Sequence, residues 1–259
     1  MSILTVFTLT LFMLGESLRM PAAALLVIPL VWLPLHMGRI GKKIFAAVLL
    51  PCAVFTGAVA IYRFARVLNG TLMRNIPVWV GIVVLLSVSV YLASGGADGI
   101  RKWTAFALPF TAGFVLISVL LLAGKLQHTV FTLPPLDSPI VVACEGIALL
   151  GILPAIGDKA KPIQAYLAAF AVASAIWATV WGLCCLTLGA QLIQMARVPF
   201  YTALRITKGG EIVSRVEAFL IPVLLFLTVH KSGVCLHEAR FAVNALVEKA
   251  PFSLSRKGA

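Results

Sequence analysis

The chain has 259 residues, of which 61% are hydrophobic and only 12% are charged, and its mean hydropathy is +1.05. Because about a quarter of the residues in an average soluble domain are charged, this composition excludes an ordinary soluble domain and indicates an integral membrane protein. The formal net charge of +12 comes from basic residues scattered over the predicted loops, which favours anionic lipid headgroups over nucleic acid as the partner.

The apolar residues form blocks of about 16 to 22 residues between short polar segments that contain Gly and Pro, which is the length of helices crossing a hydrocarbon layer of about 30 Å. Transmembrane β-strands would alternate in polarity over about ten residues, and these blocks do not. We therefore predict an all-α integral membrane protein with a single transmembrane domain over residues 1–259. The eight predicted spans are 3–18, 22–37, 44–62, 78–93, 103–123, 139–156, 166–188 and 216–234, and the last can run on to 247 as a long tilted helix.

The charges between the spans predict the orientation. If the N-terminus is cytoplasmic, the basic clusters MGRIGKK, GIRKW and GDKAK all fall on the cytoplasmic side, as the positive-inside rule requires. No positively charged region precedes the first apolar block, MSILTVFTLTLFML, so we expect a retained helix rather than a cleaved signal peptide. The charge pattern thus predicts a cytoplasmic N-terminus.

Residues 191–215 lie between the last two spans and are too polar to cross the membrane. Their apolar members, among them Leu192, Met195, Phe200 and Leu204, recur at near-helical spacing, and the pair at 209–210 is Gly-Gly, a stop signal. We therefore predict a short helix that lies on the membrane surface.

The residues that could hold a metal or carry catalysis do not match any known spacing. The five cysteines lie in or beside apolar runs without a CxxC pair, so they are interpreted as small hydrophobic residues rather than disulfide or zinc ligands. The run HKSGVCLHEAR, residues 230–240, fits no zinc pattern either. Because no nucleophile elbow, HExxH, P-loop or pair of intramembrane carboxylates is present, we expect neither an enzyme nor a cofactor or metal site.

Three segments together resemble a known family. Residues 198–232 contain an aromatic-rich surface helix, a Gly-bearing turn, an Arg-hydrophobic-acid-Ala run and a later Lys-Ser pair. In this order they are similar to the helical loop and eighth helix of the spore germination permease-like family, the B subunits of nutrient germinant receptors, within the amino acid–polyamine–organocation superfamily. Residues 143–167 (ACEGIALLGILPAIGDKAKPIQAYL) resemble the family's sixth helix, although Ala-Cys precedes the Glu where Phe-Gly is usual, and residues 11–21 (LFMLGESLRMP) resemble its first.

The resemblance implies a leucine-transporter-like bundle, built as a five-plus-five inverted repeat with broken first and sixth helices. In such folds, half-helix N-termini at the membrane centre bind an anionic group, and freed carbonyls bind a cation. Gly15 and Gly146 would be the points of unwinding; the alternative is that both are packing glycines that let helices approach closely. Family members usually have ten helices, so the eight predicted here imply a shortened member that lacks the last two.

The candidate ligand-binding residues follow from the same resemblance. Glu145, flanked by Cys144 and Gly146, would bind a ligand amine or carry a proton; the alternative is a structural ion pair, for instance with Lys231. Lys231 would be a buried charge that replaces a sodium ion or pairs with Glu145, or it would extend to the cytoplasmic interface. Glu16 could act beside Gly15, but Arg19 lies three residues on and a local pair explains both charges.

The resemblance implies one function and leaves two alternatives open. The first is a germinant-receptor subunit that binds a small nutrient, such as an amino acid, and signals with A and C subunits. The resemblance places it in the spore inner membrane or the bacterial cytoplasmic membrane. The second is a proton-coupled amino-acid transporter that works by alternating access. The third is a truncated, non-transporting remnant or assembly partner.

Overall fold

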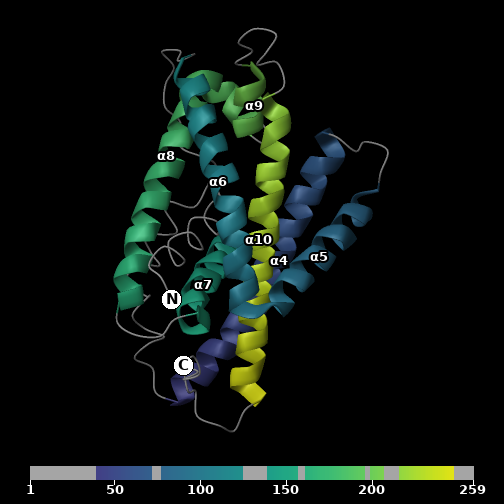
Figure 1. The fold of residues 1–259 in the computed structure, drawn as a ribbon, viewed down its shortest axis with the longest axis vertical. Helices are drawn as coiled ribbons and strands as arrows, with labels where there is room; N and C mark the ends of the chain where they lie inside the picture. Colours follow the sequence, from purple (N-terminus) through teal and green to yellow (C-terminus); the bar gives the residue numbers. More distant parts are fainter. Residues whose placement is uncertain are drawn as a thin grey trace.

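The computed structural model describes residues 39–71, 77–124, 139–156, 161–195, 199–206 and 216–247, and all elements within them are helices (Figure 1). The helices are α4 (Arg39–Thr71), α5 (Val78–Ser94), α6 (Gly96–Ala123), α7 (Pro139–Ile156), α8 (Lys161–Met195), α9 (Pro199–Ile206) and α10 (Val216–Val247). The prediction of an all-α protein is therefore confirmed for the described part of the chain. The predicted spans 3–18 and 22–37 lie outside it.

Three of these helices are long and apolar enough to cross a membrane: Gly41–Gly70, Gly96–Ala123 and Leu220–Val247. Two shorter apolar helices, Val78–Ser94 and Ala178–Gly189, accompany them. Large apolar side chains remain exposed on their outer faces, as on α6, where Phe106, Leu116 and Leu120 are 55% to 65% exposed. Such faces suit lipid rather than water, so the prediction of a membrane protein stands.

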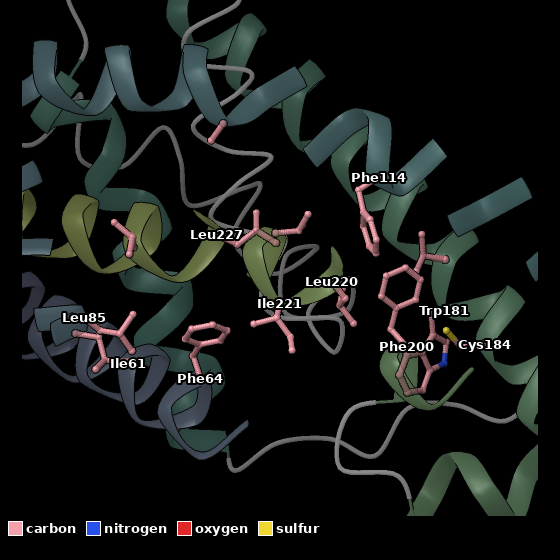
Figure 2. Close-up of a cluster of buried hydrophobic side chains, with 14 of the residues drawn as sticks. Ile61, Phe64, Leu85, Phe114, Trp181, Cys184, Phe200, Leu220, Ile221 and Leu227 are labelled. Carbon is pink, nitrogen blue, oxygen red and sulfur yellow. The ribbon is translucent and has the colours of Figure 1, made fainter. Parts of the chain in front are cut away.

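Helix α10 lies at the centre of the described bundle (Figure 1). Of its most apolar 18-residue window 67% is buried, against 39% for α4 and 28% for α6. It packs against α4, α5, α6, α7 and α9. Figure 2 shows why this core is continuous: α10 contributes Leu220, Ile221 and Leu227 between an α4–α5 side and a second group on α6, α8 and α9.

The contacts of α10 also give the directions of its neighbours. Glu145 of α7 meets Lys231, and further along both helices Gly151 meets Glu238, so α7 runs parallel to α10. Gly57 of α4 lies against the Ser232–Cys235 turn of α10, whereas the earlier residue Leu49 lies at the level of Gly151. Helix α4 therefore runs antiparallel to both.

Helix α6 buries one narrow stripe. Its buried residues recur every three or four positions, which is the spacing of a single helix face. The hydroxyls of Thr104 and Thr111 lie on this stripe and donate hydrogen bonds to the carbonyls of Ile100 and Ala107, four residues earlier. Their donors are therefore paired within the helix itself. The stripe comprises Ile100, Thr104, Ala107, Thr111, Phe114, Ser118 and Leu122.

Helix α6 begins at Gly96, earlier than the predicted start at 103. Gly95 and Gly96 were interpreted as loop, but they form the joint with α5, where Gly96 adopts φ +61°, a conformation that favours glycine. Asp98 in the first turn suits the positive end of the helix dipole. Arg101 and Lys102 consequently lie exposed on α6 rather than in a loop.

The other boundaries agree with the sequence to different degrees. Helix α10 extends to Val247, as the longer of the two predictions for this span proposed. Helix α8 is interrupted at Gly189, with φ 74° and ψ 167°, just after the predicted end at 188. A short helix is present within the predicted range: α9 begins with Pro199, a favoured first helical residue. Leu192 and Met195 instead belong to α8, and the position of α9 on the membrane surface stays a prediction. Its Phe200 is buried and meets Phe114 of α6 edge to face, with ring centroids 6.2 Å apart.

Candidate functional site

Glu145 and Lys231 form a buried ion pair between α7 and α10. The distance from Lys231 Nζ to Glu145 Oε1 is 2.8 Å, and the two side chains are only 4% and 5% exposed. A single charge in a low-dielectric interior is costly, whereas a hydrogen-bonded pair of opposite charges adds no net charge. Of the alternatives weighed for Glu145, the structural partnership with Lys231 is confirmed, and Lys231 does not extend to the interface. Whether the pair also binds a ligand stays a prediction.

The predicted break beside Glu145 is not present. Helix α7 runs without interruption from Pro139 to Ile156, through Cys144, Glu145 and Gly146. A helical glycine costs only about 1 kcal/mol relative to alanine, so Gly146 alone does not break the helix, and it is buried inside the bundle. The prediction of a broken helix is therefore wrong for α7, and Gly146 is a buried residue of a continuous helix.

Three consecutive residues of α10 reach three different helices. His230 Nδ1 lies 3.3 Å from Thr104 Oγ1 of α6, Lys231 pairs with Glu145 of α7, and Ser232 Oγ lies 2.5 Å from Ser89 Oγ of α5. Successive side chains on a helix point about 100° apart, so three consecutive residues can contact helices on three different sides. All three side chains are buried. This junction, formed by residues 230–232 and their partners, is the most polar part of the described core.

The hydrogen bonds at Thr104 indicate the histidine tautomer. The Thr104 hydroxyl already donates to the Ile100 carbonyl at 2.8 Å, so its oxygen is left to accept. His230 therefore donates from Nδ1, and the ring is oriented with this nitrogen toward α6.

The remaining predicted site residues are less well connected or fall outside the described part. Cys144 is half-buried, and all five cysteines are free thiols. Gly15 and Glu16 lie outside the described residues, so their approach to Glu145 stays a prediction. Within the described ranges, no group of three or more His, Cys, Asp and Glu side chains could hold a metal ion.

Sequence reasoning missed the partners of the junction. Ser89 and Thr104 are single polar residues in apolar helices, and neither was selected as a candidate. The available signal was weak, because Ser87 lies two residues away from Ser89 in the same sequence context yet is exposed and only bonds its own helix at Val83. Glu238 was considered only as part of a rejected metal pattern, although it is fully buried.

These observations define a helical membrane protein whose most buried helix holds an ion pair and two further polar contacts inside the bundle. Residues 32–255 match the sequence model of the spore permease family, described as a spore germination protein. Because the match spans most of the chain, the protein belongs to the spore germination permease family. No protein in a curated collection matches the chain.

Proposed function

We propose that this protein is the membrane subunit of a nutrient germinant receptor. It binds a small nutrient such as an amino acid and signals germination together with A and C subunits in the spore inner membrane. The family match supports a germination role, and the buried Glu145–Lys231 pair is the single observation that carries nutrient binding. The role requires no catalysis.

The chemistry of the pair fits a zwitterion. A free amino acid carries one ammonium and one carboxylate group, which are complementary to Glu145 and Lys231 respectively. Binding between them replaces one buried ion pair by two and leaves the net charge of the interior unchanged, so neither protein charge loses its counter-charge. Because the two side chains meet directly at 2.8 Å, binding would have to part them.

Binding of this kind separates α7 from α10, which gives a route for the signal. Helix α7 also packs on α4, so a displacement of α7 reaches two helices at once. We propose that the A and C subunits respond to this displacement. In the finer fold that we propose, a leucine-transporter-like inverted repeat, the first helix adds Gly15 and Glu16 to the nutrient site.

Equilibrium binding of a panel of labelled amino acids to the protein in lipid nanodiscs tests the proposal. Saturable binding is expected for the wild type and for Lys102→Met, which removes an exposed charge on α6. Binding should be lost in the double variant Glu145→Gln/Lys231→Met, which leaves no unpaired buried charge. Equal binding by the double variant and the wild type would contradict a site at the pair.

Uptake into proteoliposomes separates receptor from transporter. The receptor binds without accumulating the amino acid, whereas uptake that is abolished in the double variant would identify a proton-coupled transporter instead. Copurification with coexpressed A and C subunits is expected in either lipid system. Copurification without any binding or uptake would identify an assembly partner and overturn the receptor proposal.

A further inference from the structure

Glu238 is a second buried carboxyl group on α10, two turns after Lys231. Its exposed fraction is 0%. Within the described part of the chain, neither of its carboxyl oxygens has a hydrogen-bond partner. It therefore differs from Glu145, whose carboxylate is matched by the Lys231 ammonium at 2.8 Å.

The surroundings of Glu238 are apolar and closely packed. A Cβ atom placed on Gly151 of α7 would lie 3.3 Å from Glu238 Cδ and 2.5 Å from Leu49 Cδ1 of α4. The backbone of α7 thus lies directly over the carboxyl group, and a side chain at position 151 would have to displace Leu49 or Glu238. Leu49 belongs to a small buried cluster with Ala46 of α4 and Ala242 of α10, so the described side chains on this side of the carboxyl group are hydrocarbon.

The described basic groups around Glu238 do not form an ion pair with its carboxyl group. On the packed elements, Lys231 is paired with Glu145, and Lys42 lies two turns before Leu49 on α4. On α5 and α6, which contact other sides of α10, the titratable groups toward this end of the bundle are exposed. In this part of the bundle the described titratable side chains are Lys42, Lys43 and Cys52 on α4, Tyr91 on α5, Asp98, Arg101 and Lys102 on α6, Cys144 and Glu145 on α7, and His230, Lys231, Cys235, His237 and Arg240 on α10.

We propose that Glu238 is a proton-binding site, separate from the ion pair at Glu145. The carboxylate takes up one proton from the aqueous phase and becomes a neutral carboxylic acid, which the apolar pocket tolerates while a bare charge would be costly. The proton is retained as long as α7 covers the group, and it is released when α7 moves away and water reaches the oxygens. Uptake of the proton itself does not require a bound nutrient, because the pair at Glu145 and the carboxyl group of Glu238 are different groups.

Infrared spectroscopy of the protein in liposomes tests the protonation state directly. The wild type at neutral pH should show the carbonyl stretch of a protonated carboxylic acid, with the expected shift in D2O. The band should disappear in Glu238→Gln and persist in Asp98→Asn, an exposed acid on α6, and in the double variant Glu145→Gln/Lys231→Met. A wild-type spectrum without this band, or a band unchanged in Glu238→Gln, would overturn the proposal.

Two glycine substitutions that retain Glu238 test whether the backbone of α7 keeps water away from its carboxyl group. Gly151→Ala pushes α7 away from the carboxyl group, so the band should titrate away at lower pH than in the wild type. Gly113→Ala is the matched control, because a Cβ on this helical glycine of α6 meets nothing within 4 Å, and it should leave the titration unchanged. An unchanged titration in Gly151→Ala, with helical content preserved, would contradict the role of α7.

Discussion

The hydroxyl oxygens of Ser89 in α5 and Ser232 in α10 lie 2.5 Å apart inside the bundle. Each hydroxyl also lies within donating distance of its own helix, Ser89 of the Leu85 carbonyl at 2.8 Å and Ser232 of the Thr228 carbonyl at 2.7 Å. Ser232 also lies 3.3 Å from the Val229 carbonyl. Each hydroxyl has one proton, so the serine that donates to its partner shares or gives up the bond to its own helix. The contact links α5 and α10 at the same level as the buried ion pair.

Removal of either hydroxyl should therefore destabilise the bundle only modestly. Ser89→Ala and Ser232→Ala are each expected to cost about 0.6 kcal/mol, the average for interhelical hydrogen bonds in membranes, because the remaining serine returns its proton to its own helix. Ser87→Ala is the control, since this exposed serine bonds only Val83. Thermal unfolding in detergent, followed with a thiol-reactive dye at the buried cysteines, measures the difference. A loss as large in Ser87→Ala would contradict the contact.

The ion pair should behave as a strongly coupled unit. Glu145→Gln or Lys231→Met alone leaves a buried charge without its partner and is expected to cost about 3–5 kcal/mol, whereas the double variant should recover most of this loss. The same thermal assay measures all three, with Lys102→Met as an exposed control. Single variants as stable as Lys102→Met would show that the two charges are not buried together.

Gly57 should be required for the approach of α4 to α10. A Cβ at this position would lie 3.3 Å from Cys235 Cβ and 3.8 Å from Ser232 Cα, so Gly57→Leu forces the helices apart at a cost of about 1–3 kcal/mol. Gly70 lies in the same helix with nothing within 4 Å of a Cβ, and Gly70→Leu should leave the unfolding temperature nearly unchanged. Equal effects at both positions would rule out this packing.

The interruption of α8 should depend on Gly189. Its φ of 74° places it in a region that residues with a Cβ rarely adopt, so Gly189→Ala is expected to cost about 1–3 kcal/mol. Gly124 ends α6 with an ordinary φ of −74°, and Gly124→Ala should have little effect. Unfolding temperatures of the two variants provide the comparison, and a fully tolerated Gly189→Ala would mean that α8 does not bend there.

The sequence predicted those features that depend on long apolar runs. The length of α10 and the class of protein follow from hydrophobicity alone, which needs no knowledge of neighbours. The continuity of α7 could not be predicted in this way, because a glycine weakens a helix by only about 1 kcal/mol and packing decides the outcome. The prediction of where α6 begins was wrong for a related reason. Gly95 and Gly96 indicate a turn, but they do not indicate how soon the next helix begins.

The candidate site was predicted only in part, since partner choice is a property of the assembled bundle. A carboxylate and an ammonium group in apolar helices each need a partner of opposite charge. The pairing of Glu145 with Lys231 could therefore be predicted from the sequence as one of the alternatives. Ser89 and Ser87 are equivalent by sequence context, and only the orientation of α5 makes one of them a contact.

The junction at residues 230–232 has a mechanical consequence. Because adjacent residues of α10 are attached to α6, α7 and α5, any turning of α10 about its own axis would break all three attachments together. Displacing one outer helix breaks a single attachment and leaves the other two to hold the axis in place. Among the described helices, the displacement of α5, α6 or α7 alone therefore disrupts fewer of these contacts than a rotation of α10 does.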